Sequence, residues 1–154
     1  MKEVVEKLIE KNKTIATMES CTGGAVANAI TNIEGASEIL KFSAVTYSNE
    51  YKIKMGVSSD TIDKYSVYSI EVAREMAYNI AKFANANYGI GVTGKLNRVD
   101  INNPYGEDNI TFVSIYDKDN NDYEDLKIEA TKASRSENKD MIIDKIKEKV
   151  LTKI

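Results

Sequence analysis

The chain of 154 residues contains no histidine and no tryptophan, and it has one cysteine and one proline. The absence of histidine excludes the Ser-His-Asp triad, the Cys-His dyad and most zinc-hydrolase sites, because each of them needs an imidazole. A single cysteine, Cys21, excludes a disulfide within the chain. Lysine therefore remains as the base for activating a nucleophile, provided that its surroundings lower its pKa.

The sequence also lacks a large excess of one charge sign and long apolar runs. The net charge is −3 with both signs interspersed, so the chain has no basic stripe for a nucleic-acid backbone, and we expect a small ligand and no nucleic acid. No segment approaches the roughly 18 apolar residues of a membrane span. Residues 2–11 are polar and typical of a helix, not of a signal segment. We expect no membrane partner and a cytoplasmic location.

The composition is that of one folded domain. Hydrophobic residues make up 42% and charged residues 29% of the chain, values close to globular averages, and no low-complexity stretch argues for disorder. A chain of this length has little room for a second core. We expect a single domain over residues 1–154.

Hydrophobic periodicity predicts alternating helices and strands. We expect helices at 2–11, 25–30, 50–55, 69–84 and around 143–150, and strands at 14–18, 39–47, 88–92, 110–116 and 126–130. The alternation favours a parallel sheet, whereas the last two strands flank a polar turn and are typical of a hairpin. The expected fold is an α/β three-layer α/β/α sandwich with a mixed, mostly parallel sheet.

Three polar loops follow expected strands, at 19–24, 47–52 and 93–94. Ligands of open α/β sheets gather at the carboxyl ends of the strands, so these loops should converge. In the first loop, Ser20 precedes a helix, and the free N–H groups of Thr22, Gly23 and Gly24 would suit a phosphate or an oxyanion. The same residues also suit an ordinary helix cap followed by a glycine turn.

Lys52 is the candidate base, since it follows Tyr47-Ser48-Asn49 in the second loop. A lysine can act as a base when burial or a nearby positive charge brings its pKa toward neutrality. On spacing alone, however, a lysine is ordinarily a solvated surface charge. The residues by themselves leave its role open.

Residues 16–24 read Ala-Thr-Met-Glu-Ser-Cys-Thr-Gly-Gly, which resembles the T-A-E-S-C-T-G-G signature of the CinA C-terminal domain family. The likeness continues in family order through residues 35–37, 45–52, 55–57 and 71–77. Members of this family convert nicotinamide mononucleotide to nicotinic acid mononucleotide and ammonia. The resemblance implies Ser20 as nucleophile, Lys52 as its base and Tyr47 as an assisting residue, with no metal and no cofactor.

The implied mechanism is acyl transfer through an ester. Neutral Lys52 takes the proton of Ser20, which attacks the carboxamide carbon, and water opens the acyl-enzyme after ammonia leaves. The amides near Thr22 and Gly23 either stabilise the oxyanion or grip the substrate phosphate. Tyr47 relays a proton or holds Lys52, unless it is a core tyrosine at a strand end.

Two further residues have a plainer interpretation as well. We expect Cys21 to be a dispensable packing residue, since the family motif gives the nucleophile role to the preceding serine. Arg135, in Ala133-Ser134-Arg135 where the family has G-D-R, is a candidate phosphate ligand or else a solvated charge near a helix start. We also expect Thr93 to bind substrate.

The chain departs from the family pattern after residue 92. The family continues as I-A-G-P with a glycine-rich loop, whereas this chain has Lys95-Leu96-Asn97-Arg98. We expect loop 95–108 to alter substrate preference, with Lys95 or Arg98 contacting phosphate, unless it is a variable surface loop away from the ligand. Ser66 stands where a family glycine is usual.

Two functions fit these observations. One is an amidohydrolase acting on nicotinamide mononucleotide. The other is a noncatalytic nucleotide-binding or regulatory module whose substrate loop has diverged. In both, the partner is a small mononucleotide, and we expect a homo-oligomer.

Overall fold

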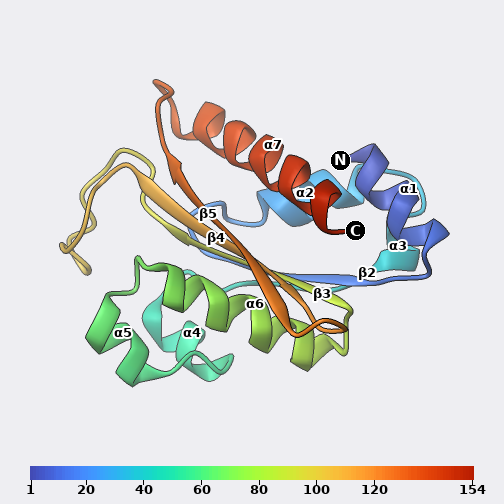
Figure 1. Ribbon diagram of the computed structural model, residues 1–154. Helices are drawn as coiled ribbons and strands as arrows, with labels where there is room; N and C mark the ends of the chain where they lie inside the picture. Colours follow the sequence, from blue (N-terminus) through green and yellow to red (C-terminus); the bar gives the residue numbers. More distant parts are fainter.

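The computed structural model describes residues 1–154 as a five-stranded sheet with helices on both faces (Figure 1). The strands are β1 (Ile15–Glu19), β2 (Leu40–Val45), β3 (Tyr88–Gly94), β4 (Ile110–Asp117) and β5 (Asp122–Glu129). In the order β2-β1-β3-β4-β5, β1 pairs parallel with β2 and β3, and β4 pairs antiparallel with β3 and β5. Four strands thus point one way and β4 opposes them, which confirms the mixed, mostly parallel sheet.

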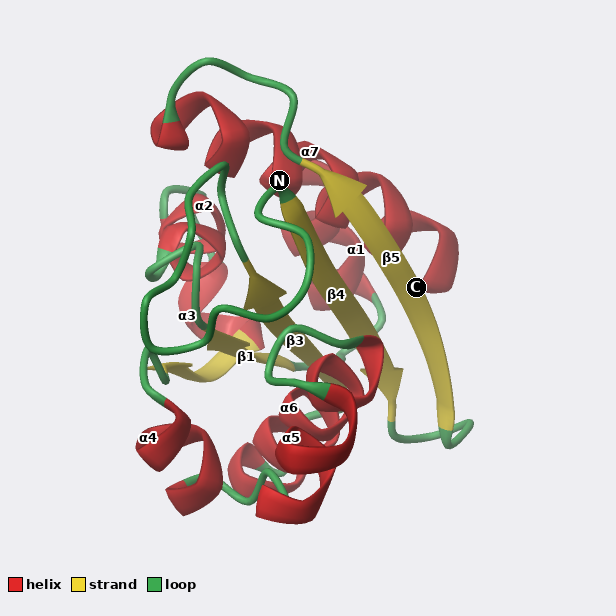
Figure 2. Ribbon diagram, turned by 90° about the vertical axis from the view of Figure 1, so that its left-hand side faces the viewer, coloured by secondary structure: helices red, strands yellow, loops and turns green.

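The helices form the two outer layers. They are α1 (Lys2–Glu10), α2 (Ala25–Thr31), α3 (Ala36–Ile39), α4 (Asn49–Lys54), α5 (Ser59–Tyr65), α6 (Ile70–Ala84) and α7 (Arg135–Lys153). Helices α1, α2, α3 and α7 lie on one face of the sheet, and α4, α5 and α6 lie on the other (Figure 1, Figure 2). The expected three-layer sandwich is therefore confirmed. A helix long and apolar enough to cross a membrane is absent.

Side chains of β3 alternate between the two layers and explain how closely α6 approaches the sheet. Ile90 and Val92 belong to the large core cluster shared with α1, α2 and α7. Gly89 and Gly91 face α6 instead, and a Cβ on Gly91 would lie 2.1 Å from the carbonyl oxygen of Ala73. Only glycine permits this contact, so the backbones of α6 and β3 can pack directly against each other.

Some elements differ from the prediction for physical reasons. The short helices α3 and α5 were not predicted, and α5 has no buried residue that would produce an apolar pattern. In α7 the buried aliphatic residues are Ile142, Ile146 and Val150, whereas Ile143 is partly buried beside them. The inward face therefore follows a four-residue spacing. The helix expected around 143–150 is present but begins earlier, at Arg135.

Candidate active site

The end of β1 sends two consecutive side chains to opposite faces of the sheet. Because side chains alternate along a strand, Glu19 turns toward α2 and Ser20 toward α4. Glu19 is fully buried and accepts hydrogen bonds from the N–H groups of Val26, at 3.1 Å, and Ala27, at 2.9 Å. Ser20 is 6% exposed, and its Oγ accepts from Lys52 Nζ at 3.1 Å.

Lys52 is the buried side chain of α4. Its Nζ also donates to the carbonyl oxygen of Thr46 at 2.8 Å, and the residue is 1% exposed. Burial lowers the pKa of Lys52 to about 8, against the opposing influence of Cys21 and Asp100. The neutral amine is therefore more populated near neutral pH than in an exposed lysine, and this form can accept the proton of the neighbouring hydroxyl.

Cys21 lies beside Ser20 but has the properties of a thiol, not of a thiolate. It is 6% exposed, and its Sγ is 3.8 Å from Thr111 Oγ1. Burial raises the pKa of Cys21 to about 11. The nucleophilic form of a cysteine is the thiolate, so Ser20 is the better prepared of the two neighbours.

Hydrogen bonds within the protein already engage N–H groups at the start of α2. The Glu19 carboxylate accepts from Thr22 Oγ1 at 2.6 Å and from the N–H of Gly24 at 3.1 Å, and the N–H of Gly23 donates to the carbonyl oxygen of Ser20 at 3.0 Å. These bonds engage both glycine amides that the sequence suggested as ligand donors. Thr22, Gly23 and Gly24 are not among the residues that line the cavity described next.

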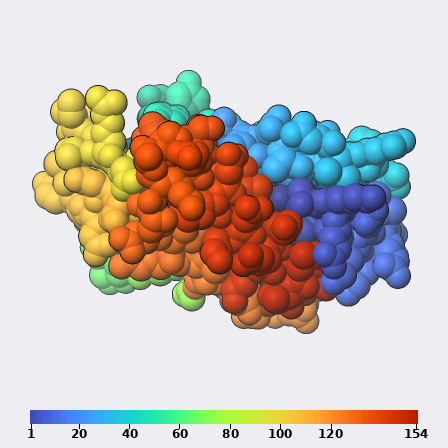
Figure 3. Space-filling view, turned by 90° about the horizontal axis from the view of Figure 1, so that it is seen from above, coloured from blue at the N-terminus to red at the C-terminus, as the bar shows by residue number.

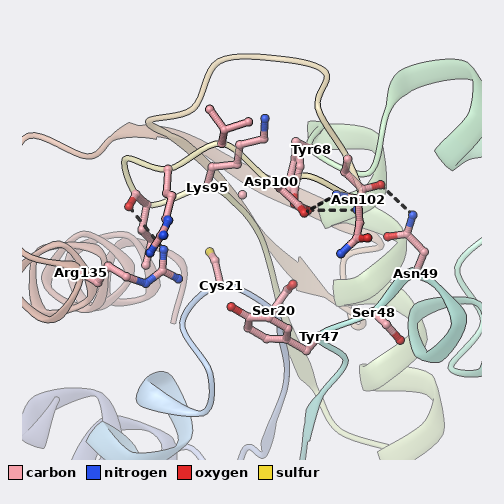
Figure 4. Close-up of a pocket in the computed structure, with 15 residues that line it drawn as sticks. Ser20, Cys21, Tyr47, Ser48, Asn49, Tyr68, Lys95, Asp100, Asn102 and Arg135 are labelled. Atoms are coloured by element: carbon pink, nitrogen blue, oxygen red, sulfur yellow. Dashed lines mark hydrogen bonds between the residues drawn. The ribbon is translucent and has the colours of Figure 1, made fainter.

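A cavity of about 440 Å³ opens over Ser20 and Cys21 (Figure 4). Its walls come from residues 47–49, Tyr68, the loop at 94–103, and Arg135 at the start of α7. Figure 3 shows that loop beside the N-terminal end of α7 at one end of the molecule. The size suits a small organic ligand. No group of three or more His, Cys, Asp or Glu side chains is arranged to hold a metal ion.

The structure brings together four of the predicted site residues. Ser20, Tyr47 and Arg135 line the cavity. Lys52 does not line it but donates a hydrogen bond to Ser20. Tyr47 is 66% exposed, and its hydroxyl forms no hydrogen bond with Ser20 or Lys52. The Lys52 amine is held instead by Ser20 Oγ and the carbonyl oxygen of Thr46. Tyr47 is therefore a wall of the cavity and not a buried core residue.

Two other predicted contacts are directed elsewhere. Thr93 is fully buried and its Oγ1 donates to the carbonyl oxygen of Val67 at 2.9 Å, so the side chain does not line the cavity. Lys95 borders the cavity, but its Nζ is paired with Asp108 at 2.9 Å and the residue is 3% exposed. Its charge is thus already neutralised within the protein.

Comparison with known proteins identifies the family. The chain matches the CinA C-terminal domain family over residues 1–141. It belongs to the CinA C-terminal domain family. Two solved structures share the fold: competence/damage inducible protein CihA from Agrobacterium tumefaciens, with TM-score 0.80, 24% identity and coverage of 98% of this chain and 92% of that one, and a CinA superfamily protein from Enterobacter cloacae, with TM-score 0.82, 21% identity and coverage of 97% and 90%.

Curated relatives are more similar over a shorter stretch. The competence-damage inducible proteins of Thermoanaerobacter sp. strain X514 and Alkaliphilus metalliredigens are 49% identical over 96 residues and 50% identical over 92 residues. These matches cover 61% and 59% of this chain but 23% and 22% of the relatives. The matched part of this CinA C-terminal domain therefore corresponds to less than a quarter of their length.

A side-chain network that the sequence did not reveal anchors loop 95–108 in this CinA domain. The Tyr68 hydroxyl donates to Asp100, Asn103 Nδ2 donates to the same carboxylate at 3.1 Å, and Asn49 Nδ2 donates to Asn103 Oδ1 at 3.0 Å. The bond from Tyr68 lowers the pKa of Asp100, so its carboxyl is ionised at neutral pH. The clustered Asp and Asn residues of the loop were the one available signal, and they do not identify partners distant in sequence.

Proposed function

We propose that this CinA domain hydrolyses the carboxamide of nicotinamide mononucleotide to nicotinic acid mononucleotide and ammonia. The observation that carries the proposal is the 3.1 Å contact between Lys52 Nζ and Ser20 Oγ on the floor of a cavity. The chain contains no histidine, so a buried lysine with a lowered pKa is the base best placed to activate the hydroxyl.

The proposed reaction runs in two halves. Neutral Lys52 accepts the Ser20 proton while Oγ attacks the carboxamide carbon, and the protonated lysine then gives this proton to the leaving nitrogen as the C–N bond breaks. Water next attacks the ester carbon while Lys52 accepts its proton, and Lys52 returns this proton to Ser20 Oγ as the ester C–O bond breaks. The acid product leaves and ionises to the carboxylate, and Ser20 is restored. The carbonyl oxygen of Thr46, 2.8 Å from Nζ, keeps the amine aimed at Oγ throughout.

We assign the oxyanion of the tetrahedral intermediate to the backbone N–H of Cys21, a residue that lines the cavity. This group donates to no other residue, whereas the amides of Gly23 and Gly24 are engaged. The N–H of the residue after a nucleophile is suited to this role, because it points to where negative charge develops. The substrate phosphate is then bound elsewhere in the cavity.

The test is ammonia release from nicotinamide mononucleotide by the purified protein, with the nucleotide product identified by chromatography. The proposal predicts equal amounts of ammonia and nicotinic acid mononucleotide. Calorimetry on the same preparation distinguishes the alternative of a noncatalytic binding module, which predicts affinity for the nucleotide without ammonia. Absence of both products would overturn the assignment of substrate.

A further inference from the structure

We propose that the cavity has two oppositely charged ends that select a zwitterionic substrate, with Arg135 and Arg98 binding its phosphate and Asp100 facing its cationic ring. This inference rests on the proposed function and names the residues that set its substrate preference. Arg98 and Asp100 belong to the loop in which this chain departs from the family sequence pattern, so their role cannot be transferred from that pattern.

The positive end lies where the start of α7 meets the loop. Arg135 Nη1 is 3.5 Å from the carbonyl oxygen of Leu96. Arg98 lies between Leu96 and Asp100 in the loop and lines the same cavity. Arg74 and Lys95 are engaged in ion pairs, whereas Arg98 and Arg135 are in none. Unpaired guanidinium groups that border a cavity suit a phosphate, which they can bind with paired hydrogen bonds.

The negative end is Asp100, the one carboxylate among the residues that line the cavity. Tyr68, Asn103 and the N–H of Asn102, the last at 3.0 Å, hold it in place. Its negative charge favours the protonated form of Lys52, so it acts on the end of the cavity where the nucleophile lies. Figure 4 shows Arg135 on one side of the cavity and Asp100 on the other, above Ser20.

This polarity matches the charge distribution of a pyridine mononucleotide. The pyridinium ring that carries the carboxamide is a cation, and the phosphate lies beyond the ribose. When the carboxamide is at Ser20, the ring lies at the Asp100 end and the phosphate extends toward Arg135. The exposed ring of Tyr47, which borders the cavity beside Ser20 (Figure 4), adds an aromatic face that also favours a cation.

Binding of four ligands to the Ser20→Ala variant measures the contributions of the ring charge and of the phosphate separately. This variant lacks the nucleophile, so the ligands are not hydrolysed during the measurement. Nicotinamide mononucleotide carries both charges, its reduced form has a neutral ring, nicotinamide riboside lacks the phosphate, and nicotinamide lacks both. Calorimetry should show that Asp100→Asn weakens the oxidised mononucleotide and the riboside about fivefold, as for a partly exposed charge pair, and leaves the reduced mononucleotide unchanged. Arg98→Gln combined with Arg135→Gln should weaken both mononucleotides and leave the riboside unchanged.

The unchanged ligand in each case is an internal control for folding, and Asn at position 100 can still accept the bond from Tyr68. Glu107→Gln is the matched control, because Glu107 belongs to the same loop, pairs with Lys127 at 3.8 Å and does not line the cavity. Equal loss of the oxidised and reduced mononucleotides in Asp100→Asn would overturn the inference, as would failure of the Ser20→Ala protein to bind any mononucleotide. Failure of the proposed function would instead be absence of ammonia release by the wild-type protein.

Discussion

Lys52 combines two properties that seldom occur together in a lysine, since it is buried and has no carboxylate within ion-pair distance. Below its pKa of about 8 the amine is protonated and cannot accept the Ser20 proton, and above it the amine is neutral. We therefore expect kcat/KM for ammonia release to be low in acid and to rise with pH to a plateau above about 8. A pH profile of ammonia release measures this directly.

Lys52→Arg should abolish that activity, with a loss of at least about a hundredfold, because a guanidinium stays protonated at every pH of the profile. Lys54→Arg is the control, since Lys54 lies on the same helix but is exposed and paired with Glu50 at 2.6 Å. Near wild-type turnover by Lys52→Arg would mean that another group activates Ser20.

Ser66 adopts a backbone conformation that glycine favours. Its φ of 72° and ψ of 152° lie in a region that is costly for a residue with a Cβ. Ser66→Gly should raise the free energy of unfolding by about 1 kcal/mol, as measured by urea denaturation, because the relief of strain outweighs the greater entropy of the unfolded chain. Ser58→Gly, at φ −69° and at the start of α5, should instead lower stability. Destabilisation by both substitutions would contradict the assignment of strain.

The Glu19 carboxylate accepts hydrogen bonds from N–H groups at the start of α2. The stability of this helix start therefore depends on the residue that directly precedes Ser20. Replacing the carboxylate by an amide turns one of its accepting oxygens into a donor facing backbone N–H groups. We expect Glu19→Gln to lower the free energy of unfolding by about 2 kcal/mol. The control is Glu38→Gln in the first turn of α3, where the side chain is exposed. Equal stability of the two variants in urea would show that Glu19 does not hold the turn.

The elements with strong apolar periodicity were predictable from the sequence. Helix α6 was expected at 69–84 and spans Ile70–Ala84, because its apolar residues recur along one buried face. Strand β5 was expected from residue 126 but begins at Asp122. Its start was missed because its first four residues are Asp, Tyr, Glu and Asp and lie at the edge of the sheet. An edge strand with polar residues has no alternation to reveal it.

The site was predictable only in part, for a similar reason. The segments around Ser20 and Lys52 have distinctive sequences. Ser20 follows β1 and Lys52 lies in α4, which follows β2, and the parallel pairing of β1 and β2 brings the ends of these two strands together. The capture of the α2 amides by Glu19 and the bond between Tyr68 and Asp100 depend instead on three-dimensional packing. No spacing in the sequence indicates which donors a buried carboxylate will find.

Across the whole molecule, the sheet carries the cavity at one end while both termini lie toward the other (Figure 1). Strand β1 lies between β2 and β3, so its carboxyl end is framed by the loops of both neighbours. The two layers contribute different parts of the site: α4 supplies Lys52, and α7 supplies Arg135. The central claim is that this arrangement prepares Ser20, and not the adjacent Cys21, as the nucleophile.

The most direct measurement is the rate of ammonia release from nicotinamide mononucleotide by Ser20→Ala and Cys21→Ala, compared with the wild-type protein. Ser20→Ala should lose at least about a thousandfold in kcat, because it lacks the atom that forms the ester. Cys21→Ala should stay within a few-fold of wild type, since its thiol is protonated and buried and its backbone N–H is retained. Loss of activity in Cys21→Ala together with turnover by Ser20→Ala would contradict the account.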